Sequence, residues 1–209
     1  SIVKYTGDGS TSKTVGHGLS SAPEIVIIKR LDTAKNWPVW ATPVMSITGS
    51  TSDYILLNSS AGKVTAASVT NLWGGNVPTS TTIGVGDSSE SNASGGEYIA
   101  YCWHSVSGYS KIGTYSTNAS TKVSTGFRPD FILMKYLASA NDWFICDSVR
   151  SDGTTGSNGG DLVKPVLYGN LSNAEASVST GSVEIVSDGF YPTNFFNSNG
   201  VLYMAFKIN

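Results

Sequence analysis

The residues that could do chemistry are few and scattered along the chain. The two histidines, His17 and His104, lie in a glycine-rich turn and at the end of an apolar segment. They do not stand three to five residues apart, so the sequence predicts no zinc site. It also contains no nucleophile elbow, no phosphate-binding loop and no dinucleotide fingerprint. A pair of carboxylates for glycoside hydrolysis stays open, because such pairs meet in space rather than in sequence.

The acidic residues mostly suit turns. Asp8, Asp87, Asp152 and Asp188 each stand beside Gly or Ser, where an Asp side chain closes an Asx-turn. A calcium loop would need several oxygens at alternating positions, and only residues 87–92 and 151–161 offer an approximation of that pattern. We therefore expect no enzymatic activity, no metal and no cofactor.

A loop rich in glycine and asparagine, residues 71–76, is the best candidate for binding. Its Trp73 has no counterpart elsewhere in the chain. We predict Asn71, Trp73 and Asn76 as ligand-binding residues, with the indole stacked on a sugar ring and the amides hydrogen-bonded to its hydroxyls. The alternative is a Trp73 folded over the edge of the core.

The elements that must position this loop are predicted to be strands. Short apolar segments rich in β-branched and aromatic residues alternate with clusters of turn residues, which is typical of a β-sandwich or barrel. The segments are residues 24–29, 53–57, 97–103, 130–135, 183–186 and 201–206. Only residues 59–67 and 172–177 suit a short helical turn. The fold class is therefore all-β.

An internal repeat of about 105 residues predicts two similar units. Residues 22–29 recur as 128–135, and residues 36–40 recur as 142–146, in each case 106 positions later. Three further blocks agree in order: residues 4–7 match 114–117, Gly18 and Leu19 match Gly126 and Phe127, and Tyr101 matches Phe206. We expect two tandem β-sandwich units, jelly-roll-like, over residues 1–107 and 108–209, with Trp37 and Trp143 packed on their sheets.

Composition excludes several classes of protein. Hydrophobic residues make up 40% and aromatic residues 11% of the chain, enough for a core, so the chain is not disordered. The formal net charge of −2 gives no electrostatic basis for binding nucleic acid. No apolar run is long enough to insert into a membrane. Both cysteines, Cys102 and Cys146, lie in apolar segments, so we expect buried free thiols.

Many blocks of the chain, in order, resemble a module of tailed-bacteriophage virion proteins that is common in phages of marine bacteria and cyanobacteria. The first of these blocks is Tyr5-Thr6-Gly7-Asp8-Gly9-Ser10, and the others are residues 16–19, 23–30, 109–115, 125–129, 147–150, 171–175, 187–190 and 203–206. The resemblance implies a tail-fibre-like structural protein of the virion, folded in the host cytoplasm and exposed on the particle. It offers no catalytic residues to carry over.

Three functions follow from the residues and the resemblance together. The first is a fibre or spike domain that binds a host-surface glycan or receptor, as a homo-oligomer such as a trimer. The second is a capsid decoration or other structural module that binds virion proteins, with Trp73 at a subunit contact. The third is a glycan-degrading enzyme with two carboxylates in a cleft. We favour the first.

Overall fold

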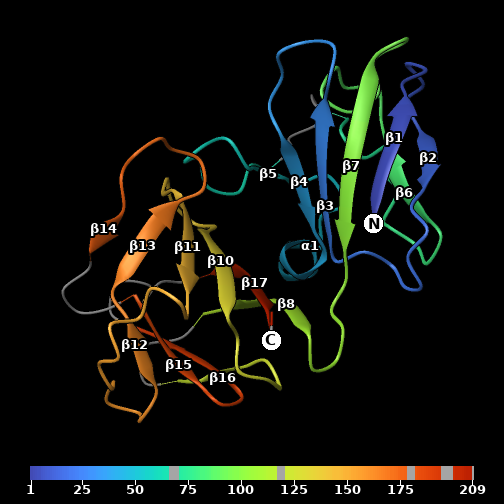
Figure 1. The fold of residues 1–209 in the computed structure, drawn as a ribbon. Coiled ribbons are helices and arrows are strands. Elements are labelled where there is room, and N and C mark those ends of the chain that lie inside the picture. Colours follow the sequence, from blue (N-terminus) through green and yellow to red (C-terminus); the bar gives the residue numbers. More distant parts are fainter. Residues whose placement is uncertain (66–70, 117–120, 178–181, 194–199, 209) are drawn as a thin grey trace. The chain divides into compact units, whose positions relative to one another are not determined.

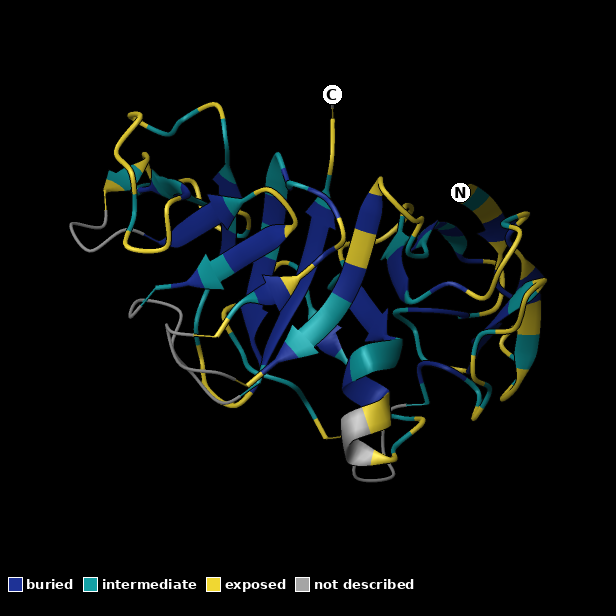
Figure 2. Ribbon diagram, turned by 90° about the horizontal axis from the view of Figure 1, so that it is seen from below, coloured by how far each residue is buried: buried dark blue, intermediate teal, exposed yellow. Residues whose placement is uncertain are grey.

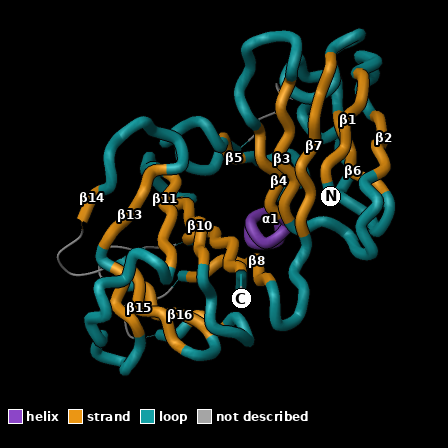
Figure 3. The backbone as a smooth tube through the Cα atoms, in the orientation of Figure 1, coloured by secondary structure: helices purple, strands orange, loops and turns teal. Residues whose placement is uncertain are grey.

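The computed structural model describes residues 1–65, 71–116, 121–177, 182–193 and 200–208, and it divides into two compact units (Figure 1). The units are Ser1–His104 and Ser105–Asn209, so the division falls slightly before the boundary expected at residue 107. Strands dominate both units, which confirms the all-β prediction (Figure 3). No described helix has the length and apolar character needed to cross a membrane.

The described part of the first unit contains two antiparallel sheets. Its elements are β1 (Ile2–Thr6), β2 (Lys13–Gly16), β3 (Ile25–Arg30), β4 (Pro38–Ala41), α1 (Thr42–Thr48), β5 (Ile55–Leu56), β6 (Thr82–Val85) and β7 (Glu97–Trp103). The larger sheet has the order β1-β7-β3-β4-β5, and β2 pairs with β6 in the smaller sheet. The first and last strands of the unit are neighbours, with Tyr5 opposite Tyr98.

The second unit has the same plan with additional strands. Its elements are β8 (Ser110–Tyr115), β9 (Val123–Ser124), β10 (Phe131–Tyr136), β11 (Trp143–Asp147), β12 (Asp161–Val163), β13 (Pro165–Tyr168), β14 (Ala176–Ser177), β15 (Val183–Val186), β16 (Gly189–Pro192) and β17 (Val201–Phe206). The larger sheet has the order β14-β13-β11-β10-β17-β8, and the smaller one has the order β12-β15-β16-β9.

Each unit is sandwich-like, because one apolar core joins its two sheets. In the first unit Val26 and Ile28 of β3 belong to the same buried cluster as Val15 of β2 and Ile83 of β6. In the second unit the corresponding cluster joins β10 and β17 to β15 and β16. Buried residues follow the strands, and exposed residues lie mainly in the connecting loops (Figure 2).

Equivalent backbone hydrogen bonds recur in the two units. The Glu24 N–H donates to the Trp103 carbonyl at 2.7 Å, and the Asp130 N–H donates to the Phe206 carbonyl at 2.8 Å. Pro23 and Pro129 stand just before these two donors and so occupy the same position, where a missing N–H is tolerated at the entry to a strand.

The two tryptophans of the repeat are also equivalent. The Trp37 N–H donates to Asn58 Oδ1 at 3.0 Å, and the Trp143 N–H donates to Asn170 Oδ1 at 2.8 Å. Each of these asparagines also donates from Nδ2 to the residue before the tryptophan, Asn36 in one unit and Asp142 in the other. Trp143 is buried and Trp37 is half-buried.

The last repeat block needs a correction of two residues. The hydrogen bonds above make Trp103, not Tyr101, the equivalent of Phe206, and strand register agrees, since Ile25 lies opposite Trp103 and Phe131 lies opposite Phe206. A shift of two residues along a strand leaves every side chain on the same face. The apolar pattern therefore fits both alignments, and only the hydrogen bonds distinguish them.

The one described helix was not among the expected helical turns. Described residues 59–65 are not helical, and residues 176–177 belong to β14. Helix α1 instead follows β4, with a proline in its first turn and Gly49 at its end. Gly49 adopts φ 66° and its N–H donates to the Met45 carbonyl, which is a left-handed C-cap. Proline at the start and glycine past the end are a sequence pattern typical of a helix, and they would have predicted α1.

Candidate functional site

The structure buries Trp73, so the prediction of an exposed stacking surface is wrong for this residue. Its side chain is 3% exposed, its Nε1 donates to the Asp53 carbonyl at 3.1 Å, and its ring meets Trp40 edge-on at a centroid distance of 5.6 Å. An indole with both faces covered by protein cannot stack on a sugar ring. The alternative, a tryptophan folded onto the core, is what the structure has.

The two asparagines of the predicted site hold their own loop together. Asn71 Oδ1 accepts the Gly74 N–H at 2.9 Å, and its Nδ2 donates to the Thr11 carbonyl at 2.6 Å. Asn76 Nδ2 donates to Ser12 Oγ at 2.8 Å and to the Gly74 carbonyl at 3.1 Å. Thus both amides make intramolecular contacts, and the structure gives residues 71–76 a structural role.

The reason that Trp73 occurs only once lies in the smaller sheets. In the second unit β12 and β15 contribute Val163, Val183 and Ile185 to the core. In the described part of the first unit the smaller sheet has only β2 and β6, and Leu72 and Trp73 belong to its core cluster. A residue present in one copy therefore compensates for strands present in the other, which is a packing role rather than a ligand site.

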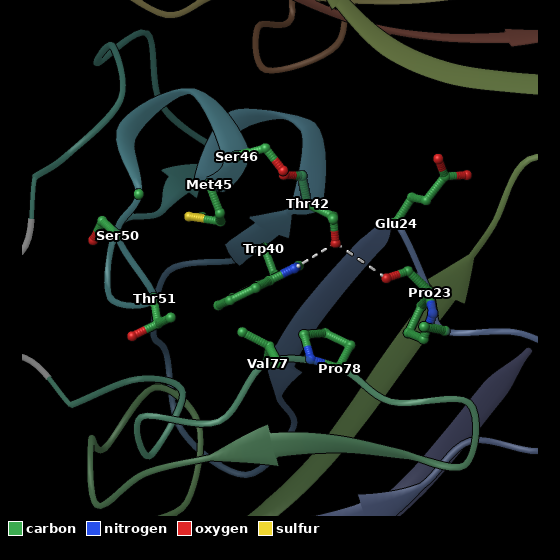
Figure 4. A pocket seen from close by; sticks show the side chains of 12 residues that line it. Pro23, Glu24, Trp40, Thr42, Met45, Ser46, Ser50, Thr51, Val77 and Pro78 are labelled. Carbon is green, nitrogen blue, oxygen red and sulfur yellow. Dashed lines mark hydrogen bonds between the residues drawn. The ribbon is translucent and has the colours of Figure 1, made fainter.

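A pocket beside α1 is the better candidate site (Figure 4). Its cavity volume is about 430 Å³, and all of its lining residues belong to the first unit. They are Ala22, Pro23, Glu24, Trp40, Thr42, Met45, Ser46, Gly49, Ser50, Thr51, Val77 and Pro78. The volume falls within the range of roughly 300–1,000 Å³ that is usual for small-molecule sites.

Local structure explains why this pocket has an apolar wall and polar edges. Trp40 is the third residue of β4, and α1 starts two residues later, which places Met45 and Ser46 next to the indole. The Trp40 Nε1–H donates to Thr42 Oγ1 at 3.0 Å, and the Thr42 hydroxyl donates to the Pro23 carbonyl at 3.3 Å. The Ser46 hydroxyl donates to the Thr42 carbonyl at 2.9 Å.

The second unit has different chemistry at the equivalent position. Register places Trp40 opposite Val26 and Cys146 opposite Ile132, so Cys146 is the equivalent of Trp40. The described chain after β11 makes a turn rather than a helix. Arg150 holds this turn, with Nε donating to Asp147 at 2.7 Å and Nη1 donating to Glu175 at 3.1 Å. At this position the second unit thus has a buried cysteine and the ion pairs of Arg150 in place of Trp40 and α1.

The remaining chemical candidates have structural roles. Asp8 accepts the Ser10 N–H and Asp152 accepts the Thr154 N–H, the predicted Asx-turns. Within the described ranges no three His, Cys, Asp or Glu side chains come together as metal ligands. Both cysteines are buried free thiols, as predicted, and burial raises the pKa of Cys102 to about 11 and the pKa of Cys146 to about 12. Neither is a reactive nucleophile.

His17 is also structural. It is 2% exposed, its Nδ1 accepts the Leu19 N–H at 3.0 Å, and its Nε2 lies 3.0 Å from the Thr79 carbonyl. These contacts connect the turn at His17 to the loop at Thr79 within the first unit.

Comparisons with known proteins identify a family but not an activity. No curated protein and no solved structure matches the chain. One family model, described as a domain of unknown function, matches residues 1–208 and so spans both units of the repeat. The chain therefore belongs to the DUF7483 family.

Proposed function

We propose that this protein is a non-enzymatic binding module of a bacteriophage virion, and that it recognises a host-surface glycan through the pocket beside α1. The phage assignment rests on the sequence resemblance described above. The binding role rests on one observation, which is that Trp40 lines a cavity of about 430 Å³ in the first unit, whereas Cys146, at the equivalent position of the second unit, is buried in the core. Some contacts that stabilise the fold recur in both units, such as the hydrogen bonds of Trp37 and Trp143, whereas the Trp40 wall of the pocket does not, because Cys146 takes its position in the second unit.

The composition of the pocket supports a small polar ligand with an apolar part. Pro23, Trp40, Met45, Val77 and Pro78 supply apolar surface, and the hydroxyls lie at Thr42, Ser46, Ser50 and Thr51. Sites for small molecules combine a mostly apolar lining with a few polar groups in this way. A sugar ring presents the matching combination of C–H faces and hydroxyls.

Val77 offers a direct test, because its side chain is 53% exposed at the pocket and can be changed without opening the core. We expect Val77→Ser to weaken binding of the purified full chain to immobilised lipopolysaccharide from marine bacteria and cyanobacteria. The matched control is Val149→Ser, which changes an 89% exposed valine on the turn that replaces α1 in the second unit. Equal binding by both variants and the unaltered chain would contradict the proposal.

A second candidate function is a contact with another virion protein, either as a capsid decoration or within a homo-oligomer such as a trimer. The apolar wall of Trp40, Met45 and Pro78 with the exposed Val77 beside it favours this function, because an apolar side chain of a partner could pack against that wall. Here Val77→Ser would leave binding to lipopolysaccharide unchanged and would reduce assembly into particles. Light scattering after size-exclusion chromatography would show whether the variant also loses self-association.

A further inference from the structure

The ionisable groups around the pocket limit the charge of its ligand. Of the twelve lining residues only Glu24 ionises, and its carboxylate points away from the Trp40 ring (Figure 4). None of these residues is Lys, Arg or His. Proteins usually hold carboxylate and phosphate groups with arginine or lysine. An anionic sugar in this pocket would lose its hydration without gaining a charged partner, which is unfavourable.

The hydrogen bonds already made inside the pocket limit the ligand further. The hydroxyl protons of Thr42 and Ser46 go to the carbonyls of Pro23 and Thr42, and the indole proton of Trp40 goes to Thr42 Oγ1. These side chains have used their donors, whereas the hydroxyl oxygens keep lone pairs that can accept. A ligand group next to Thr42 and Ser46 is therefore best matched when it presents a donor, as sugar hydroxyls and amide N–H groups do, whereas the hydroxyls of Ser50 and Thr51 lie at another edge of the pocket (Figure 4). Carboxylate and phosphate oxygens present only acceptors.

We infer that the pocket beside α1 selects an uncharged sugar that carries an apolar substituent, such as the methyl of a 6-deoxyhexose or of an acetamido group. This inference rests on the proposed glycan-binding function and specifies its ligand class. The apolar wall supplies the reason for the substituent, because Trp40, Met45 and Val77 offer a methyl group contacts that they cannot offer a hydroxyl. Met45 also adapts its shape readily, as thioether side chains do.

The experiment is a titration of the isotope-labelled full chain with four methyl glycosides, followed by NMR. The probes are those of N-acetylglucosamine, a 6-deoxyhexose, glucose and glucuronic acid. We expect the 6-deoxyhexose and the acetamido sugar to bind about fourfold tighter than glucose, the factor that corresponds to ~0.8 kcal/mol for one buried methyl-sized group. Glucuronide should bind most weakly. Shifted signals should include the Trp40 indole N–H, and Val77→Ser should reduce the preference while Val149→Ser retains it.

The outcomes separate this inference from the function on which it rests. Tightest binding by the glucuronide would overturn the inference and leave a glycan-binding function standing. The same holds if glucose binds as well as the substituted sugars. If none of the four glycosides shifts any signal and lipopolysaccharide also fails to bind, both the inference and the proposed function are wrong.

Discussion

Trp40 and Trp73 meet edge to face, with ring centroids 5.6 Å apart and an interplanar angle of 84°. Trp40 lies in β4, which corresponds to β11 in the second unit. Trp73 lies in residues 71–76, for which the sequence repeat shows no equivalent. Trp40 also lines the pocket. The pair therefore connects the core of the first unit to its candidate site.

Replacing Trp73 should cost stability. We expect Trp73→Ala to lower the free energy of unfolding by about 3–5 kcal/mol, because it removes a buried indole and leaves a cavity beside Trp40. Urea denaturation of the full chain measures the loss. Trp37→Ala is the control, since Trp37 is only half-buried and should cost less. A change below about 1 kcal/mol for Trp73→Ala would contradict its role in the core.

The repeated asparagines should contribute unequally although they make the same contacts. We expect Asn170→Ala to destabilise by roughly 1–3 kcal/mol and Asn58→Ala by roughly 0.5–1.5 kcal/mol. Asn170 donates to the Asp142 carboxylate at 2.8 Å and is half-buried, whereas Asn58 donates to the neutral Asn36 amide at 3.1 Å and is exposed. Hydrogen bonds to charged groups are the stronger ones. Chemical denaturation of the two single variants decides the order, and the reverse order would refute the argument.

The carboxylate of Glu184 organises a glycine-rich turn. It is 3% exposed, and it accepts the N–H groups of Asn158 and Gly160 at 2.7 and 2.8 Å and the Asn158 Nδ2 at 2.8 Å. Glu184→Gln replaces one accepting oxygen by a donor, so we expect a loss of about 1–3 kcal/mol. Glu175→Gln is the matched control, because that side chain is 47% exposed in its ion pair and should cost less than about 1 kcal/mol. Thermal unfolding of both variants measures the two losses of stability. Equal losses would show that the turn does not depend on the Glu184 carboxylate.

Lys135 should make stability depend on pH. Burial lowers the pKa of its ammonium from 10.5 to about 8, against an opposing effect of Asp142. Between about pH 8 and 10.5 the unfolded chain then binds more protons at this group than the folded chain. The contribution of Lys135 to stability therefore rises with pH in that window.

We expect the stability of the unaltered chain relative to Lys135→Met to increase from pH 8 to 10.5. The subtraction removes the opposing effect of the buried thiols, whose raised pKa values lower stability above pH 9 in both proteins. A flat difference would show that burial does not lower the pKa of Lys135 in the folded chain.

The all-β class, the repeat and the buried thiols could be predicted from the sequence, because each depends on local patterns. Pro23 and Pro129 mark the start of an apolar strand, because a residue without an N–H is tolerated there. The alternation of apolar and polar residues along a strand shows which face is buried. The helix α1 was also readable in principle, from Pro43 and Gly49. By contrast, the sequence could not show that Phe206 is the equivalent of Trp103 rather than of Tyr101 in the repeat. Both choices put the same side chains on the same faces, and only hydrogen bonds between distant strands separate them.

The candidate site could be located only from the tertiary structure. Sequence comparison shows that Trp73 occurs once, but a residue can occur once because it binds a ligand or because it fills a space that the other copy fills with strands. In the structure Trp73 fills a space. Leu72 and Trp73 belong to the core cluster of the first unit, whose described residues include no counterparts of β12 and β15. Trp40, by contrast, reads as an ordinary strand residue, and it lines a pocket only because α1 and residues 77–78 come together around it. Local patterns in a sequence determine which face of a strand is buried, whereas the burial of a loop residue such as Trp73 and the formation of a cavity depend on segments that meet across the fold.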